Sequence, residues 1–121
     1  MTPRDYVHPS VGDLTLPSVL AAMSDPTRLE MLRRLADGAE HDSLTLADDL
    51  PRSTLTYHTR VLREAGVTRT RGVGRSCVIS LRTDDLEARF PGLLPAVLRQ
   101  AQAHAEGDAA DAGLPDPSAA P

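Results

Sequence analysis

Residues 52–82 constrain the fold most, because their hydrophobic period changes within a few positions. Leu55, Thr59 and Leu62 recur at helical spacing along residues 52–65, and Gly66 is placed to end that helix in the left-handed conformation. From Val67 the pattern alternates with a period of two, first over residues 67–71 and again over residues 77–81. The glycine-containing stretch 72–74 lies between the two runs and predicts the tip of a β-hairpin. The sequence therefore predicts a helix followed directly by a projecting hairpin.

The charge of this segment is opposite to that of the rest of the chain. It carries seven arginines against one acid, Glu64, a net charge of +6 in a 121-residue protein whose formal net charge is -4. The remaining residues therefore sum to -10. Exposed charges are screened beyond about 8 Å at physiological salt, so a local basic face is more informative than the sequence pI of about 5.4. Such a face suits a polyanion, and the very low aromatic content favours duplex DNA over single strands.

Helix signals precede the segment. Apolar residues from 14 to 23 predict a short first helix with Pro17 in its first turn. Asp25 is placed to cap a second helix, Pro26 to occupy its first position and Gly38 to end it. Residues 39–43 read as a loop, and the leucines of residues 44–50 predict a short third helix before the turn at Pro51. Two short helices around a tight turn form a helix-turn-helix.

After the hairpin, the capping cluster at 83–85 precedes a last helix that ends near Ala105, with Pro95 in its first turn. The predicted fold is mainly α with a small β-hairpin, a winged helix-turn-helix in the order α-α-α-α-β-β-α. Residues 1–13 are predicted to be a flexible arm, 14–106 the DNA-binding and dimerisation domain, and 107–121 a disordered acidic tail. One cysteine excludes an internal disulfide, and no membrane span or signal peptide is found, so a cytoplasmic protein is expected.

Two motifs resemble one family of regulators. The segments LAAMSDPTRLEMLRRL at 20–35 and LTYHTRVLREAGV at 55–67 are similar to the ArsR/SmtB (arsenic-repressor) type of bacterial regulator, and the likeness covers about residues 14–105. The resemblance implies a homodimeric repressor of transcription whose first and last helices form the dimer interface. It also implies that an effector bound elsewhere releases the protein from its operator.

The residues expected to contact DNA lie on the helix 52–65 and on the hairpin. Side chains at the start and outer side of such a helix can read base edges in the major groove of a palindromic operator, and hairpin arginines can contact phosphates or the minor groove. The predicted contacts are Arg52, Ser53, Thr54, Thr56, Tyr57, Arg60, Arg69, Arg71 and Arg75. Alternatively, the hydroxyls only cap and solvate the helix, and the hairpin arginines only protect a sheet edge. His58 lies nearer the buried side, where we expect a structural hydrogen bond.

The predicted dimer interface consists of apolar residues of the first and last helices. It comprises Leu14, Leu16, Leu20, Leu94, Val97, Leu98 and Ala101. The same residues could equally belong to the core of the monomer, because a small domain needs its apolar residues.

The sequence indicates the effector less clearly than it indicates the DNA-binding residues. The Cys-x-Cys site of the metal-sensing branch is replaced by Asp42 and Leu44, so no tight arsenite response is expected. His104 with Asp108, and His41 with Asp42, are candidate ligands for nickel or zinc, although exposed histidines without a metal are more common. Cys77 reads as a small buried hydrophobe. The effector could also be a partner protein, or be absent.

An enzyme is not predicted. The sequence has no phosphate-binding glycine loop, paired catalytic carboxylates or Ser/His/Asp elbow. The alternative to a DNA-binding regulator is a winged-helix protein-interaction module that keeps the fold without reading DNA.

Overall fold

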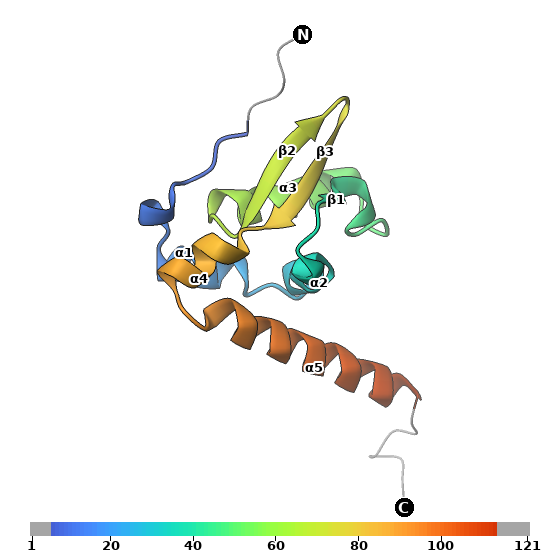
Figure 1. The fold of residues 1–121 in the computed structure, drawn as a ribbon. Coiled ribbons are helices and arrows are strands. Elements are labelled where there is room, and N and C mark those ends of the chain that lie inside the picture. The colour runs from blue at the N-terminus through green and yellow to red at the C-terminus, as the bar shows by residue number, and fades with distance from the viewer. Residues whose placement is uncertain (1–5, 114–121) are drawn as a thin grey trace, which may run out of the picture.

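A computed structural model describes residues 6–113, with side chains described for residues 6–107. The predicted winged helix-turn-helix is confirmed: helices surround a small antiparallel sheet whose hairpin projects on the side away from the last helix (Figure 1). The helices are α1 (Leu16–Ala22), α2 (Pro26–Arg34), α3 (Arg52–Glu64), α4 (Thr83–Arg89) and α5 (Leu93–Gly113). The strands are β1 (His41–Asp42), β2 (Thr68–Val73) and β3 (Ser76–Leu81), and short 3-10 turns occupy Val11–Asp13, Leu35–Asp37 and Ser43–Thr45.

The predicted starts of the first two helices are confirmed. The Thr15 hydroxyl accepts from the Ser18 amide at 3.3 Å, and the Asp25 carboxylate accepts from the Arg28 amide at 3.0 Å, which satisfies backbone donors that lack helical partners. Proline follows in the first turn of both helices. Helix α2 tightens into a 3-10 turn and ends at Gly38, whose φ of 78° is in the left-handed region.

Gly66 ends helix α3, as predicted, with a φ of 83°. The structure adds a second requirement for glycine at this position. A Cβ atom here would overlap the Leu14 side chain and lie close to Pro9. Gly66 therefore both ends the helix and makes room for the segment that precedes α1.

The sheet has the order β1-β3-β2, and both pairings are antiparallel. Thr70 lies opposite Ile79 and Val73 opposite Ser76, so Gly74 and Arg75 form the turn. Gly74 has a φ of 59°, as predicted for the hairpin tip, whereas Gly72 lies within β2. This register directs Thr68 and Thr70 inward and Arg69 and Arg71 outward.

Two local predictions between α2 and α3 are wrong. Residues 41–42 form strand β1 rather than loop, because they pair with Val78 and Ile79 of β3. The predicted third helix at 44–50 is only the 3-10 turn Ser43–Thr45, followed by irregular turns to Pro51. Asp42 caps this turn by accepting from the Leu44 amide at 2.9 Å.

Both predicted chain ends also need correction. Helix α5 continues to Gly113, past the predicted end at 105 and the predicted tail boundary at 107; residues 114–121 lie outside the described residues. Within the predicted flexible arm, residues 6–13 contact the domain: the Thr70 amide donates to His8 Nε2 at 2.9 Å, and Arg82 Nη1 donates to the Pro9 carbonyl at 2.8 Å. Residues 1–5 lie outside the described residues.

Candidate nucleic-acid interface

Helix α3 separates buried from exposed side chains as the sequence predicts. Leu55, Thr59 and Leu62 are buried against the core. Of the predicted base-reading residues, Thr54 is half-buried and the others are exposed; these are Arg52, Ser53, Thr56, Tyr57 and Arg60. An exposed polar face on a helix that is held by its apolar side is the geometry that a recognition helix requires.

The arginines of the hairpin and helix differ in their partners. Arg71 forms a two-point ion pair with Glu40, at 2.9 and 2.7 Å, and Arg69 Nη2 lies 3.4 Å from Asp85. The hydrogen bonds between Arg71 and Glu40 lower the pKa of Glu40 and raise the pKa of Arg71. Arg52, Arg60 and Arg75, by contrast, make no hydrogen bond or ion pair to any other described residue. These three guanidinium groups are the ones free to meet phosphates or base edges.

A buried arginine supports helix α3 from behind. Arg28 is 9% exposed, and it donates through Nε to the Ala22 carbonyl at 2.6 Å and through Nη2 to the Ala21 carbonyl at 3.4 Å. Its Nη1 lies 3.2 Å from Nδ1 of His58 on α3. Because a guanidinium group only donates, Nδ1 of His58 is the acceptor of this bond. The predicted structural hydrogen bond of His58 is confirmed, whereas its partner Arg28 was not predicted.

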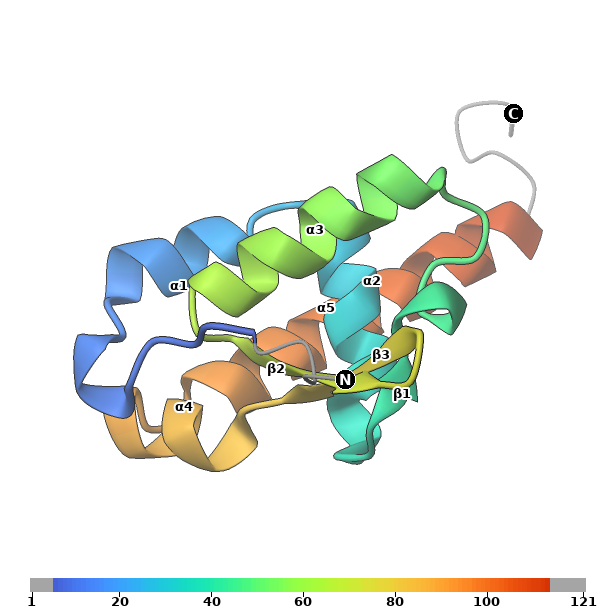
Figure 2. The same ribbon diagram turned by 90° about the horizontal axis from the view of Figure 1, so that it is seen from above.

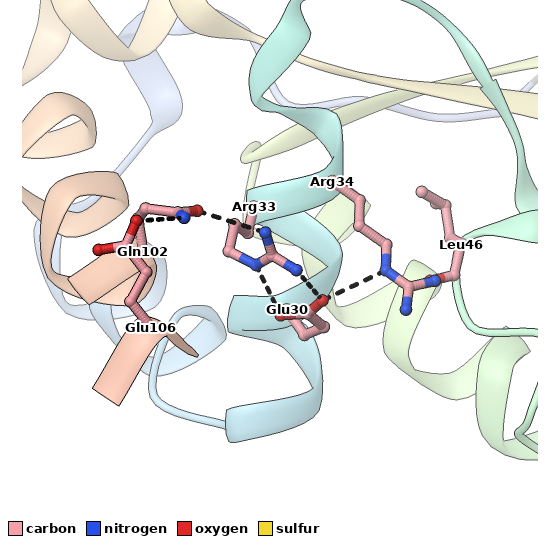
Figure 3. A network of polar contacts seen from close by, with 6 residues as sticks. All are labelled: Glu30, Arg33, Arg34, Leu46, Gln102 and Glu106. Carbon is pink, nitrogen blue, oxygen red and sulfur yellow. Dashed lines mark hydrogen bonds and ion pairs between the residues drawn. The ribbon is translucent and has the colours of Figure 1, made fainter. Parts of the chain in front are cut away.

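A polar network joins helix α5 to the turn that precedes α3 (Figure 3). Glu30 accepts from Arg33 at 2.9 and 2.6 Å and from Arg34 at 3.3 Å, and the hydrogen bonds to Arg33 are the main cause of its lowered pKa. Arg33 Nη1 also donates to Gln102 of α5 at 3.3 Å, and Arg34 Nη1 donates to the Leu46 carbonyl at 2.9 Å. The network thus spans α5, α2 and the turn of the helix-turn-helix.

The metal candidates with described side chains do not come together. Nε2 of His41 lies 2.9 Å from both carboxylate oxygens of Asp37, while Asp42 caps a turn and His104 is exposed on α5. The side chain of Asp108 lies outside the described residues. Among the residues with described side chains, no three His, Cys, Asp or Glu groups are placed to hold a metal ion. The described side chains therefore do not form a nickel or zinc site, and the pairing of His104 with Asp108 stays a prediction.

The predicted dimer residues divide into two groups. Leu14 and Leu94 are buried in the monomer core, at 1% and 2% exposure, so their prediction as interface residues is wrong. Leu16 and Leu20 are 43% and 44% exposed on α1. Leu20, Val97 and Ala101 line an apolar groove of about 1050 Å³ between α1, α2 and α5, and Leu98 is half-buried beside the core.

No helix among the described residues is long and apolar enough to cross a membrane.

Comparison with known proteins decides the family. The helix-turn-helix domain family matches residues 23–71. The chain is 35% identical over 79 residues to an uncharacterized HTH-type transcriptional regulator, YceK, of Bacillus subtilis (strain 168), covering 63% of this chain and 79% of that protein. A second uncharacterized HTH-type regulator, of Methanocaldococcus jannaschii, is 33% identical over 58 residues, covering 46% of this chain and 65% of that protein.

Solved structures agree with the sequence comparison. A crystal structure of an ArsR family transcriptional regulator is 27% identical with a TM-score of 0.55, covering 75% of this chain and 90% of that chain. The crystal structure of a possible transcriptional regulator for arsenical resistance is also 27% identical. Its TM-score is 0.52, and the match covers 84% of this chain and 99% of that chain. The chain belongs to the ArsR family of helix-turn-helix transcriptional regulators.

The fold is shared more widely among such regulators. The transcriptional repressor BigR from Xylella fastidiosa is 24% identical with a TM-score of 0.51, covering 62% of this chain and 85% of that chain, and shows the likeness of fold. Family and fold together make this ArsR-family chain a DNA-binding transcriptional regulator and not an enzyme.

Proposed function

We propose that this regulator represses transcription from the cytoplasm as a homodimer bound to a palindromic operator. The observation that carries the proposal is the set of arginines without partners among the described residues: Arg52 and Arg60 on α3, and Arg75 at the hairpin tip. Helix α3 inserts its exposed face into the major groove, where guanidinium and hydroxyl groups read base edges. Arg75 contacts the phosphate backbone from the wing, which is the hairpin formed by β2 and β3.

The ion pairs of the wing refine the list of DNA contacts. Arg71 and Arg69 are held by Glu40 and Asp85, and each must leave its carboxylate to reach DNA. Solvent screens both pairs, because the arginine side chains are exposed, so separating them costs little. We therefore propose Arg52, Arg60 and Arg75 as the main contacts, and Arg69 and Arg71 as weaker ones.

The experiment that tests the proposal first identifies the operator by the protein's own choice of DNA sequence. The wild-type chain selects fragments from a random double-stranded library, and binding to the enriched fragment is measured over a range of salt concentrations. Replacing Arg52 and Arg60 by Gln is expected to weaken binding by about 1–3 kcal/mol per arginine. The slope of log K against log salt is negative, and Arg75→Gln is expected to make it shallower by about 0.9.

Arg99→Gln serves as the control, because Arg99 is exposed on α5 and lies outside the groove. It is expected to leave both affinity and slope unchanged. Failure to enrich any sequence, or unchanged binding by the Arg52 and Arg60 variants, contradicts sequence-specific DNA reading. That result favours a protein-interaction module with the same fold.

The effector is proposed to act through α5, as a divalent metal, another small ligand or a partner protein. The polar network from Gln102 through Arg33, Glu30 and Arg34 to the Leu46 carbonyl supports a route from α5 to the turn before α3. A shift of α5 that breaks this network changes the support of the helix-turn-helix.

A further inference from the structure

A small cleft lies between helix α3 and the inner face of the hairpin. It has a volume of about 280 Å³ and is bounded by α3, β2, β3, the turn at Ser43–Thr45 and the segment before α1. In Figure 2 the segment before α1 crosses between α3 and β2. Pockets for drug-sized ligands run from about 300 to 1000 Å³, so this cleft suits a small ion or group.

The lining of the cleft is cationic and rich in hydroxyl groups. It contains three arginines, Arg52, Arg63 and Arg75, and no acidic residue. Arg52 and Arg75 make no hydrogen bond or ion pair to other described residues, and the Arg63 guanidinium carbon lies 5.1 Å from the centre of the Tyr6 ring. The serine and threonine side chains of the lining are Ser43, Thr56, Thr59, Thr70 and Ser76. Guanidinium and hydroxyl groups are the donors that proteins use for phosphate oxygens.

One residue that lines this cleft has a buried hydroxyl without a hydrogen-bond partner. Thr70 is 5% exposed, and its Oγ1 has no hydrogen-bond partner among the described residues. The Thr59 hydroxyl, in contrast, donates to the Thr56 carbonyl at 3.0 Å. An unsatisfied buried hydroxyl costs free energy, which a bound acceptor would recover. Thr70 thus points to a ligand that accepts hydrogen bonds.

We propose that this cleft binds one tetrahedral oxyanion, with phosphate as the representative chemistry. Arg63 supplies charge from α3, Arg52 and Arg75 close the site from the helix start and the hairpin tip, and the Thr70 hydroxyl donates from β2. The oxyanion is either a phosphate of the DNA backbone or a free anion. The inference rests on the proposed DNA-binding function only for the first of these sources.

Such a site couples the recognition helix to the wing. The three arginines come from different parts of the chain, so a shared oxyanion fixes the hairpin tip relative to α3. If the anion is a DNA phosphate, it aligns both elements on one backbone. If it is free, it neutralises Arg52 and Arg75 before DNA arrives and weakens operator binding.

Inorganic phosphate is the probe for the free full-length chain, titrated at constant ionic strength and followed by amide chemical shifts. Saturable shifts at Thr59, Thr70 and Cys77 are expected, because these residues line the cleft. Hydrogen bonds to charged groups are strong, so Thr70→Val and Arg63→Gln are each expected to weaken phosphate binding about tenfold or more.

The chain offers a matched control for the threonine. Thr68 is also on the inner face of β2, is fully buried and also has an Oγ1 without a partner among the described residues, but it does not line the cleft. Thr68→Val is therefore expected to keep the wild-type affinity for phosphate. Shifts that rise linearly without saturation, or equal affinities in the Thr68 and Thr70 variants, overturn the proposal.

A second measurement identifies the source of the oxyanion and separates this proposal from the DNA-binding function. Operator affinity is measured with phosphate replacing chloride at constant ionic strength. Displacement of bound phosphate by DNA, with a weaker operator affinity for Thr70→Val, assigns the site to a backbone phosphate. Simultaneous binding of phosphate and DNA, or inhibition by phosphate with Thr70→Val keeping its operator affinity, assigns it to a free anion. Saturable phosphate binding in a chain that binds no DNA supports the site and contradicts the proposed function.

Discussion

At the scale of single residues, Arg28 links the two sequence motifs that resemble the ArsR/SmtB family. It lies in the motif at 20–35 and holds His58 in the motif at 55–67, thirty residues apart in sequence. Its remaining donors go to carbonyls at the end of α1. A buried cation with these partners makes the position of α3 depend on α1 and α2.

Arg28→Met is expected to lower the free energy of unfolding by about 1–3 kcal/mol, because it leaves His58 Nδ1 and the Ala22 carbonyl without their buried donor. Urea titrations measure this change. Arg99→Met is the control, since Arg99 is exposed, and a change of no more than about 0.5 kcal/mol is expected. Equal stability of the Arg28 and Arg99 variants contradicts the supporting role.

Sequence patterns predict the conformation of a single residue well where that conformation depends only on neighbouring residues in the chain. Gly38 and Gly66 were predicted to end helices, and both have the positive φ that such ends require. For Leu14 and Leu94 the apolar pattern predicts a place on the dimer surface, but both residues lie in the core. Core and interface leucines have the same chemistry, so only the three-dimensional packing distinguishes Leu14 from Leu16.

At the scale of elements, the segment before α1 completes the outer edge of β2. The Thr70 amide donates to His8 Nε2, so this ring must be neutral to accept the bond. Burial, followed by the nearby charges of Arg82, Arg69 and Arg63, lowers the pKa of His8 below its ordinary value of 6.5. The unfolded chain therefore binds the proton more readily than the folded chain does.

Linkage fixes the sign of the resulting pH dependence. The contribution of His8 to stability is complete above pH 6.5 and is lost as the pH falls through the lowered pKa of the folded state. His8→Gln keeps an acceptor for the Thr70 amide but does not titrate. Urea unfolding between pH 7.5 and 5 is expected to show a smaller loss of stability in His8→Gln than in the wild type. Identical pH profiles contradict the role of His8.

The elements that sequence analysis missed depend on distant partners. Strand β1 has two residues, which carry no periodicity, and it forms because β3 offers a free edge. The leucines at 44–50 follow a helical pattern, yet the chain there forms a single 3-10 turn with Asp42 as its cap. The Arg71–Glu40 ion pair joins residues that are 31 positions apart. The charge of the hairpin can therefore be counted from the sequence, but the carboxylates that pair with its arginines cannot be predicted from it.

At the scale of the whole molecule, the groove between α1, α2 and α5 is where a second copy is proposed to dock. Leu20, Met23 and Leu29 face Val97 and Ala101 across it, and its surface is mostly apolar. Groove and hairpin lie on different sides of the molecule, as Figure 1 shows for α5 and the β2–β3 tip. The proposed dimerisation through α1 and α5 would therefore leave both hairpin tips free for DNA.

Leu20→Glu tests this arrangement, because a two-fold dimer carries each substitution twice. A cost of about 1.4 kcal/mol per copy becomes about 2.8 kcal/mol per dimer, or roughly a hundredfold in the dissociation constant. Leu44→Glu is the matched control: Leu44 is also 44% exposed but lies outside the groove. Sedimentation equilibrium is expected to show a dimer for the wild type and the Leu44 variant and a monomer for the Leu20 variant. A monomeric wild type, or equal weakening by both substitutions, rules out the groove as the interface.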